Sequence, residues 1–416
     1  MSNRKTIVVG YSAAALASLQ KLREPGSVIL VDEPDVVRKR KIDAEVQKYS
    51  VVDKLIPFEY QREEAADAFF AEVRHLDVVS VVPIQEYATP FAARLAERFG
   101  VPGASYGASL IMRNKNRLRA VTKAFGIKNP ASETVSNLAE LEAFAASHPG
   151  SLIIKPANRQ GSVGTVIVHD PSTLASAWQA SQTRDEGVMV PDRGFPEITL
   201  AEQFIKGSEY SVEALVVAGK IIFSNVTQKD LFDGVHPVES GHTVPAALKP
   251  AETDLLVGNT QKVLDATGFQ TGIIHCEWMF DGQDAYLIEC AGRFAGDGII
   301  DLIERAYRFD IVKCYHAIMR GESLTDLPVR AEKTAKVRFV GGRNGKISDI
   351  QLNETALTRP GIAYYSVTAK VGDTTVEPSM SWHRLGSVTV EADTSELANK
   401  LISDAIAGIQ ISYSTP

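Results

Sequence analysis

The sequence predicts a mixed α/β and α+β protein of about three domains. Its 416 residues, 44% of them hydrophobic, exceed what one core usually holds, so the chain should divide into several. Near the N-terminus, short apolar runs that suit buried strands alternate with helix-like stretches, which is the α/β pattern. Farther along, strand-rich pairs follow one another, which is the α+β pattern.

The first predicted domain covers residues 1–110. A strand, a helix and a second strand open it as a βαβ unit, and a further strand and helix continue the alternation, so we expect a Rossmann-like α/β domain. Proline and glycine at 102, 103 and 107 then punctuate the chain. The expected elements are the strands Thr6–Gly10, Val28–Asp32 and Val78–Pro83 and the helices Ala13–Leu22 and Thr89–Phe99.

Asp32, at the end of the second strand, raises the alternative of a dinucleotide site, because an acid there can bind an adenosine ribose. The glycine fingerprint of such a site is missing. Gly10 is followed by Tyr11, Ser12 and three alanines, whose Cβ atoms obstruct close approach of a pyrophosphate. We therefore interpret this segment as part of the fold and not as an NAD site.

A second domain is expected over residues 111–327, with a subdomain at about 130–205, and a small α+β domain over 328–416. Ile111–Phe125 predicts one basic amphipathic helix. The polar stretch Asn225–Thr243 separates two strand-rich pairs and predicts a long functional loop. The other expected elements are the helices Ser136–Ala146 and Thr394–Ile409 and the strands Ser151–Lys155, Thr199–Phe204, Tyr210–Val217, Gly272–Phe280, Ala285–Cys290, Lys336–Val340 and Ser387–Val390.

Charge and cysteine content favour a cytoplasmic protein that acts on small molecules. A net charge of −7 and a pI near 5.7 give no general attraction to nucleic acid or anionic lipid. Cys276, Cys290 and Cys314 show no CxxC spacing, which fits a reducing compartment. The N-terminus runs from Met-Ser-Asn-Arg-Lys directly into a strand pattern too short for a signal peptide or membrane span. We expect no nucleic-acid and no membrane partner.

A lysine at a strand end, followed by a glycine loop, is the first pattern that carries chemistry. Lys155 precedes a loop containing Gly161, Ser162 and Gly164. Such a loop can direct backbone N–H groups toward phosphates while the lysine neutralises their charge. An ordinary hairpin turn would also suit this Gly-Ser-x-Gly run, and the loop lacks the Gly-Lys-Ser/Thr ending of a P-loop.

Two carboxylates on successive apolar strands, Glu277 and Glu289, form the second pattern. Facing carboxylates repel unless a cation lies between them, and such oxygen ligands suit Mg²⁺ held jointly with nucleotide phosphates. Neutralisation by Arg293 or Lys336 is the alternative. We therefore expect a magnesium site on this pair of strands.

The predicted pairing of these strands depends on the loop between them. If that loop is Gly282–Asp284, Asp281 opposes Ala285, and Glu277 then falls across from Glu289 on the same face. A simple two-residue turn would miss this pairing by one residue.

Two further patterns are weaker when each stands alone. Arg293 follows Glu289 among small residues, and its planar guanidinium suits bidentate contact with a phosphoryl group, although an ordinary salt bridge is the alternative. Glu202 and Glu209 stand seven residues apart across a Gly-Ser turn, which alone would indicate a surface hairpin.

Taken in order, these patterns resemble the ATP-grasp superfamily, from the first strand to the C-terminal domain. The resemblance implies a three-domain ATP-grasp architecture, with an N-terminal Rossmann-like domain, a central ATP-grasp domain and a small C-terminal domain. It rests on the helix with Lys115, on Lys155 and its glycine loop, on the Glu202–Glu209 hinge, and on the cluster of Glu277, Glu289 and Arg293.

The resemblance also implies ATP, two Mg²⁺ ions in the simplest case, and Mn²⁺ as a substitute. Arg293 would steady an acyl phosphate and a tetrahedral intermediate, and Glu277 and Glu289 would ligate the metal. The nucleotide would be bound by Lys115, Lys155, Gly161, Ser162 and Gly164 at the phosphates, by Glu202 and the backbone of Gln203, Phe204 and Ile205 at adenine, and by Glu209 at the ribose.

Within the superfamily, the runs Val238–Ala246, His275–Glu277 and Gly292–Asp297 look most like the L-amino-acid ligases, which make dipeptides. By that resemblance Glu239 and His242 lie beside the reaction centre and are catalytic together with Arg293.

The implied enzyme is an ATP-dependent carboxylate–amine ligase that forms an amide through an acyl phosphate and releases ADP and phosphate. The substrates would be a small carboxylate and a small amine, both amino acids, and a homodimer is left open. The alternatives are an ATP-grasp carboxylase or carboxylate ligase of nucleotide or biotin metabolism, and a non-catalytic nucleotide sensor. Many relatives place Asn where this chain has Ala291, so a third metal ligand is not identified.

Overall fold

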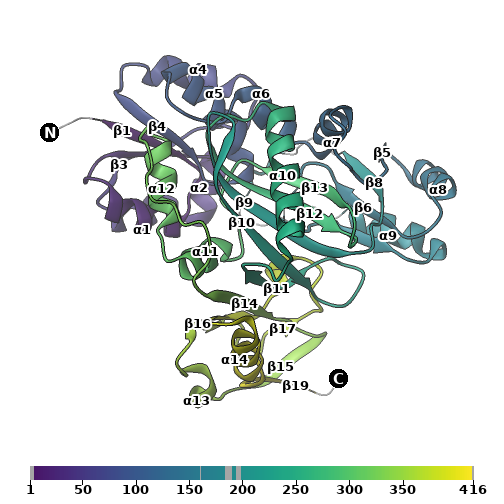
Figure 1. The fold of residues 1–416 in the computed structure, drawn as a ribbon. Helices are drawn as coiled ribbons and strands as arrows, with labels where there is room; N and C mark the ends of the chain where they lie inside the picture. Colours follow the sequence, from purple (N-terminus) through teal and green to yellow (C-terminus); the bar gives the residue numbers. More distant parts are fainter. Residues whose placement is uncertain (1–3, 160, 183–189, 194–197, 415–416) are drawn as a thin grey trace.

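The computed structural model describes residues 4–159, 161–182, 190–193 and 198–414 (Figure 1). Gln160 of the expected glycine loop, parts of the expected 130–205 subdomain and the first three residues lie outside the described residues. The chain is of mixed α/β class, as the sequence predicts. No helix in the described part of the chain is long and apolar enough to cross a membrane.

The N-terminal segment forms a four-stranded sheet in the order β3-β2-β1-β4. All three strand pairs are parallel, as the βαβ pattern predicts. Buried valines, leucines and isoleucines on both faces pack against the surrounding helices. The elements are β1 (Lys5–Val9), α1 (Ala13–Leu22), β2 (Val28–Asp32), α2 (Pro34–Arg40), α3 (Ile42–Glu45), β3 (Val52–Pro57), α4 (Ala65–Val73), β4 (Val78–Pro83) and α5 (Thr89–Phe99).

Asp32 has a structural role in this domain. Its carboxylate accepts hydrogen bonds from the backbone N–H groups of Tyr11 and Glu33, both at 2.8 Å. The side chain is buried, so the acid fastens the loop after β1 to the end of β2.

The helix expected over Ile111–Phe125 is wrong in detail, because two helices occupy this region. They are α6 (Tyr106–Met112) and α7 (Lys115–Ala124). Asn114 stands between them, and its side chain accepts from the N–H groups of Asn116 and Arg117, which caps a new helix. Lys115 is therefore the first residue of α7.

A small antiparallel sheet, in the order β5-β8-β6-β7, forms the next unit. Its core lies between the sheet and two helices, and in Figure 1 it projects from the side of the molecule. The elements are β5 (Ser132–Val135), α8 (Leu138–Ser147), β6 (Leu152–Pro156), β7 (Val166–Val168), α9 (Leu174–Ser181) and β8 (Thr199–Gln203).

An eight-stranded sheet in the order β13-β12-β9-β10-β11-β14-β18-β16 forms the centre. One face packs against α10, which lies across the sheet in Figure 1. Part of the other face is polar, and beyond it α11 and α12 cover an apolar part. The elements are β9 (Ser208–Val217), β10 (Lys220–Leu231), β11 (Glu239–Val244), α10 (Pro250–Thr267), β12 (Gly272–Phe280), β13 (Ala285–Ala291), α11 (Ile299–Tyr307), α12 (Ile311–Ile318) and β14 (Thr334–Val340).

The expectation of a long loop over Asn225–Thr243 is wrong. Most of this stretch forms the strands β10 and β11, and only residues 232–238 connect them. Its polar side chains can occupy buried sheet positions because oppositely charged groups on the nearby strands β9 and β12 pair with them.

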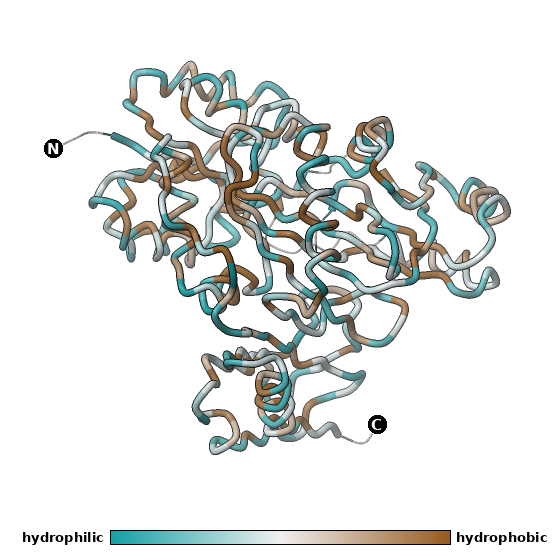
Figure 2. Tube along the Cα trace, viewed as in Figure 1, coloured by the Kyte–Doolittle hydropathy of each residue, from teal (hydrophilic) through white to brown (hydrophobic). Residues whose placement is uncertain are grey.

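The C-terminal segment extends the central sheet, because β14 pairs with β11 and β18 pairs with β14. A three-stranded sheet, β17-β15-β19, lies beside it. Figure 2 shows apolar residues concentrated along the interior strands of the molecule and hydrophilic residues in the outer loops. The remaining elements are β15 (Gly345–Leu352), α13 (Glu354–Leu357), β16 (Ile362–Val367), β17 (Thr374–Thr375), β18 (Gly386–Ala392), α14 (Ser395–Ala407) and β19 (Ile409–Tyr413).

Candidate active site

A cavity of about 1440 Å³ lies against the polar face of the central sheet. Its walls come from the loops after β1 and β4, from the glycine loop after β6, from β9 to β13, and from the C-terminal Ser381 and Trp382. The volume exceeds that of a typical single-ligand site. It can therefore accommodate a nucleotide together with smaller substrates.

Glu277 and Glu289 stand directly opposite each other on β12 and β13, as predicted, but the register has another cause. Phe280, and not Asp281, opposes Ala285. From that pairing alone Glu277 would face Ile288. A β-bulge adds one residue to β13 and brings Glu289 across from Glu277 instead.

Arg119 lies at this bulge. Its Nη2 donates to the carbonyl oxygen of Ile288 at 2.7 Å, and its Nε donates to Glu202 Oε1 at 3.0 Å. The buried guanidinium therefore joins the bulged strand β13 to the hinge strand β8. Sequence reasoning assigned it no role.

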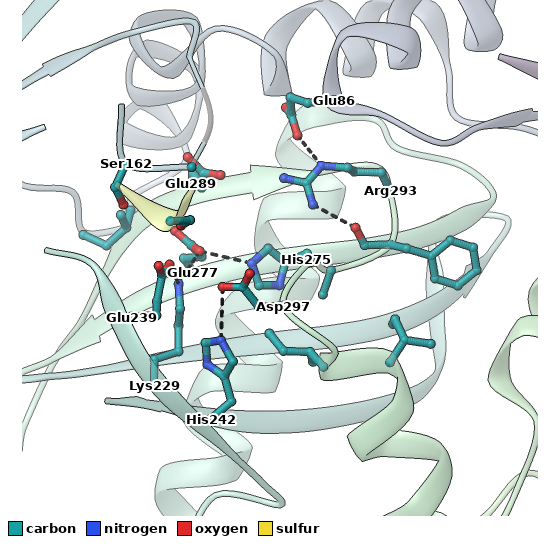
Figure 3. Close-up of a pocket in the computed structure, with 18 of the residues that line it drawn as sticks. Glu86, Ser162, Lys229, Glu239, His242, His275, Glu277, Glu289, Arg293 and Asp297 are labelled. Carbon is teal, nitrogen blue, oxygen red and sulfur yellow. Dashed lines mark hydrogen bonds and ion pairs between the residues drawn. The ribbon is translucent and has the colours of Figure 1, made fainter. Parts of the chain in front are cut away.

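Lys229, on β10, supplies the positive charge at the centre of the polar face (Figure 3). Its Nζ lies 2.5 Å from Glu277, 2.7 Å from Glu209 and 3.4 Å from Glu239. Burial opposes the charge of this lysine, but the three carboxylates raise its pKa well above 10.5. One ammonium group thus joins the expected ribose residue Glu209, the expected catalytic residue Glu239 and the expected metal ligand Glu277.

His275 and Lys115 complete the charge balance of the carboxylate pair. His275 bonds to Glu213 at 2.8 Å and to Glu277 at 3.1 Å, and although burial favours its neutral form these hydrogen bonds raise its pKa to about 9. Lys115 Nζ lies 2.7 Å from Glu289. Burial and Glu277 raise the pKa of Glu289, but Lys115 and Arg293 together lower it, and the net shift is downward.

Neither of the two cations that the sequence offered as neutralisers forms an ion pair with Glu277 or Glu289 in the described structure, although Arg293 is close enough to lower the pKa of Glu289. Lys336 donates to Asn399, and Arg293 pairs with Glu86. Neither cation belongs to the strands that carry the carboxylate pair, so its distance from them could not be inferred from the sequence.

Lys155, at the end of β6, is buried beside Glu202, with 2.5 Å between Nζ and Oε2. Burial lowers the pKa of Lys155, whereas Arg119 and Lys155 together overcome the burial of Glu202 and lower its pKa to about 2. The carboxylate of Glu202 is therefore engaged by two cations, and it does not line the cavity. A role at adenine would be indirect, through the position of Lys155.

The glycine loop closes one side of the cavity. Ser162 adopts a left-handed conformation and its hydroxyl donates to the carbonyl oxygen of Pro237 at 3.0 Å. A side chain at Gly161 would lie 3.3 Å from the ring of Trp382, and one at Gly164 would lie 2.7 Å from the Ser181 carbonyl oxygen. Gly164 thus serves close packing, whereas Gly161 and Ser162 line the cavity.

Arg293 lies on the opposite wall and forms the salt bridge that the sequence left open as the alternative. Its Nε pairs with Glu86 at 2.7 Å and its Nη1 donates to the Phe294 carbonyl oxygen at 2.8 Å (Figure 3). Burial disfavours its charge, but Glu86 and Glu289 raise its pKa. It is a salt-bridge residue that also faces the cavity.

His242 is held at the C-terminal side of the cavity. Its Nε2 lies 3.4 Å from Asp297, and the guanidinium of Arg384 grips the same carboxylate at 2.7 and 2.9 Å. His242 Nδ1 and Glu239 Oε2 are buried without a hydrogen-bond partner in the described structure. Unpaired buried polar atoms are costly and often mark a position where a ligand binds.

Most of the predicted site residues meet in this one cavity. The lining residues among them are Lys115, Lys155, Gly161, Ser162, Phe204, Glu209, Glu239, His242, Glu277, Glu289 and Arg293. Gly164, Glu202, Gln203 and Ile205 do not line it. For Gln203 and Ile205 the expected contact was through the backbone, so their side chains are not informative.

Several residues of the site were missed. Lys229, Glu86 and Arg119 contact predicted residues, and Arg384 holds Asp297, which contacts the predicted His242. The sequence offers a signal only for Lys229, which stands in an alternating polar stretch that is a strand. His275 and Asp297 lie within the family-like runs but had received no role.

The donor set fits a nucleotide and a divalent cation. Lys115 and Lys155 provide positive charge for phosphates, and Glu277 and Glu289 provide facing oxygen ligands, held in place by ammonium groups. No group of three or more His, Cys, Asp or Glu side chains suited to a metal occurs in the described part of the chain. Mg²⁺ commonly takes one or two carboxylates and completes its shell with phosphate and water, so two facing carboxylates suffice.

Comparison with known proteins identifies two domain types in this chain. Residues 148–301 match the model of the ATP-grasp domain, and residues 338–414 match that of the L-amino acid ligase C-terminal domain 2. A solved L-amino acid ligase from Bacillus licheniformis superposes with a TM-score of 0.78 at 19% identity, covering 99% of each chain.

Two curated relatives come from Bacillus subtilis. An alanine–anticapsin ligase is 25% identical over 57% of this chain and 52% of its own length, so the match spans about half of that enzyme. An L-arginine-specific L-amino acid ligase is 23% identical over 69% of this chain and 68% of its own length.

Fold, site and matches define an ATP-grasp enzyme of the ADP-forming carbon–nitrogen ligase class. The chain contains an ATP-grasp domain at residues 148–301 and, with its C-terminal domain, resembles the L-amino acid ligases.

Proposed function

We propose that this enzyme joins two L-amino acids into a dipeptide through an acyl phosphate, at the expense of ATP. The observation that carries the proposal is that Lys115, Lys155, the facing carboxylates and Arg293 line one cavity. The C-terminal domain, which matches that of the L-amino acid ligases, supports it. We also propose domain boundaries near residues 110 and 327.

Lys115, Lys155 and the loop residues Gly161 and Ser162 would hold the nucleotide phosphates, because all four line the cavity. The backbone at Phe204 and the carboxylate of Glu209 would hold the adenosine. In these roles the lysines neutralise phosphate charge, and the left-handed backbone at Gly161 and Ser162 lets the chain approach closely.

Glu277 and Glu289 would hold Mg²⁺, which when bound polarises the phosphate oxygens and offsets their charge. Arg293 orients the carboxylate that becomes phosphorylated and stabilises the oxyanion that develops during amide formation. His242 and Glu239, with their unpaired buried atoms, lie where the amine could lose its proton. His242 would serve as the base, since Asp297 fixes the orientation of its ring.

The test is a panel of amino-acid pairs assayed for ADP, orthophosphate and peptide, with each amino acid alone as the control. We expect stoichiometric ADP, phosphate and dipeptide with at least one pair. Stoichiometric AMP would contradict an acyl-phosphate route. ADP release that requires bicarbonate instead of a second amino acid would favour the carboxylase alternative.

A further inference from the structure

The N-terminal sheet contributes its own wall to the cavity at the place where the strand order reverses. β2 and β3 follow β1 on one side, whereas β4 lies on the other side of β1. In open α/β sheets, ligands bind beyond the carboxyl ends of the strands at such a switch point. The cavity is lined by the segments that follow β1 and β4, which are Gly10–Ala15 and Ile84–Glu86. Every residue of the two segments except Gly10 lines it.

The first turn of α1 presents free backbone donors there. α1 has ten residues, and its N-cap Ser12 accepts from the N–H of Ala15 at 3.4 Å. Helix geometry leaves the earlier N–H groups, those of Ala13 and Ala14, without a partner in the helix. No hydrogen bond from either group occurs within the described structure. The end of the helix therefore carries a partial positive charge directed at the cavity.

Gln85 supplies a second and independent donor. Its side chain is only 8% exposed, it lines the cavity, and its Nε2 has no hydrogen-bond partner in the described structure. Gly10 leaves the space that this side chain occupies, because a Cβ there would lie 3.2 Å from Gln85 Cγ. A buried amide donor is rarely left unpaired without a ligand or water to receive it.

Arg40, the last residue of α2, adds a full positive charge. Its Nη1 donates to the Tyr11 carbonyl oxygen at 3.2 Å, and its guanidinium carbon lies 4.9 Å from the centre of the Tyr11 ring. It forms no ion pair with any described carboxylate. Asp32, the nearby acid, is already bonded to two backbone N–H groups. The remaining N–H groups of Arg40 are free to bind an anion in the cavity.

We propose that the first turn of α1, Gln85 and Arg40 form an anion subsite that binds the non-reacting carboxylate of the amino acid that supplies the amine. This inference rests on the proposed function. The reacting carboxylate must lie elsewhere, between Arg293 and the phosphate-binding lysines. The amine-supplying amino acid keeps its own carboxylate throughout peptide formation, so it needs a separate partner.

The surroundings separate the two anions. Glu86, the residue after Gln85, is held by Arg293 (Figure 3), so the subsite lies beside the proposed reaction centre. This salt bridge does not use the donors of the subsite. A carboxylate and a phosphate monoester would both satisfy these donors, so the experiment must distinguish them.

The test compares a free amino acid with its carboxamide as the amine donor, using the most active pair from the panel. For the wild-type enzyme the carboxamide should raise KM by roughly 10- to 100-fold, because a hydrogen-bonded charge is lost. Arg40→Gln and the similarly sized Gln85→Met should raise KM for the free acid about tenfold or more. Both should discriminate less between acid and carboxamide, with KM for ATP unchanged.

Arg38→Gln is the matched control, because Arg38 is exposed on the same helix and does not line the cavity. It should behave as wild type. Thermal melting establishes whether each variant is folded. If Arg40→Gln does not fold, Gln85→Met is the variant that tests the proposal. Undiminished discrimination in a folded Arg40→Gln or Gln85→Met enzyme would overturn the proposal.

Failure of the proposed function can be recognised separately. If no amino-acid pair releases ADP, inorganic phosphate is titrated calorimetrically into the protein saturated with a non-hydrolysable ATP analogue. If phosphate binds to wild type and Arg38→Gln but at least tenfold more weakly to Arg40→Gln, the anion subsite is supported and its assignment to a carboxylate is rejected. Equal binding, or none, would reject the subsite as well. Turnover of a sugar phosphate with the same dependence on Arg40 would identify the anion as phosphate and overturn the amino-acid assignment.

Discussion

Arg293 offers the sharpest test of the proposed reaction centre, because it forms a salt bridge and also lines the cavity. Nε and Nη1 are committed to Glu86 and to the Phe294 carbonyl oxygen. The third nitrogen, Nη2, has no hydrogen-bond partner in the described part of the chain. We expect Nη2 to bind the phosphoryl oxygen or the developing oxyanion while the other two nitrogens fix its position.

Arg293→Lys removes this fixed donor but keeps the charge. One ammonium can still pair with Glu86, so the fold should be preserved, but it cannot also present a planar donor to the reacting group. Loss of one preorganised donor costs about 3–4 kcal/mol in the transition state. We therefore expect kcat to fall by roughly 10²- to 10³-fold while nucleotide affinity stays within a few-fold of wild type.

Glu86→Gln is the matched control, because it removes the salt bridge and retains an oxygen that can accept from Nε. If Arg293 acts on the reaction, this variant should lose less than about tenfold in kcat, since a neutral hydrogen bond still orients the guanidinium. Steady-state kinetics gives kcat, and calorimetric titration of a non-hydrolysable ATP analogue gives the affinity. Equal losses in the two variants, or a loss confined to nucleotide binding, would show that Arg293 is only a salt-bridge residue.

Three further outcomes are expected. The pKa of His275 is raised from 6.5 to about 9, so its stabilising charge is present below pH 6.5 and is lost as the pH rises through about 9. In urea unfolding without ligands, the free energy of unfolding of the wild type should fall by up to about 3 kcal/mol over this range, and that of His275→Gln should fall clearly less. Parallel pH profiles of the two proteins would refute this expectation. In Arg119→Lys the lysine cannot bind Glu202 and the Ile288 carbonyl oxygen together, so the free energy of unfolding should fall by about 2–4 kcal/mol. Arg117→Lys, at an exposed position of the same helix, should leave the free energy of unfolding unchanged. Trp382→Ala should speed hydrogen exchange at residues 161–165 without nucleotide, because the ring packs on Gly161, and unchanged exchange would count against that contact.

Local signals allowed many elements to be predicted to the residue. α1 begins after Ser12, whose side chain caps it, and β12 is a mostly apolar run from Gly272 to Phe280. The break between α6 and α7 was missed, although Asn114 is a good capping residue. A hydrophobic pattern that continued across it suggested one helix, and the cap prevailed.

The facing of Glu277 and Glu289 was predicted, but its mechanism could not be. The bulge in β13 is hydrogen-bonded by Arg119, which is 169 residues away in sequence. Likewise, Arg293 and its partner Glu86 are 207 residues apart. Contacts of this kind depend on the tertiary arrangement of several units, and no spacing rule within one segment can supply them.

The misinterpretation of β10 has a physical cause that also concerns function. Strands in a sheet interior are usually recognised by apolar residues, yet this strand carries the buried polar residues Asn225, Thr227 and Lys229 at alternate positions, which share one face. Asn225 and Thr227 donate to the buried Glu213 at 3.0 and 2.5 Å. Hydrogen bonds and ion pairs have replaced apolar packing on this face, so a hydrophobicity pattern could not identify it.

This replacement explains how the enzyme can fold before any ligand binds. Glu209, Glu277 and Glu289 would repel one another if they faced the cavity alone, and burial would favour their protonated forms. Lys229 and Lys115 lie among them, so the carboxylates are balanced by the protein itself. A divalent cation at Glu277 and Glu289 must compete with these ammonium groups, and incoming phosphates offer the ammonium groups new partners. Metal and nucleotide should therefore bind most strongly together. The metal replaces the ammonium groups at the carboxylates, and the phosphates then pair with the ammonium groups.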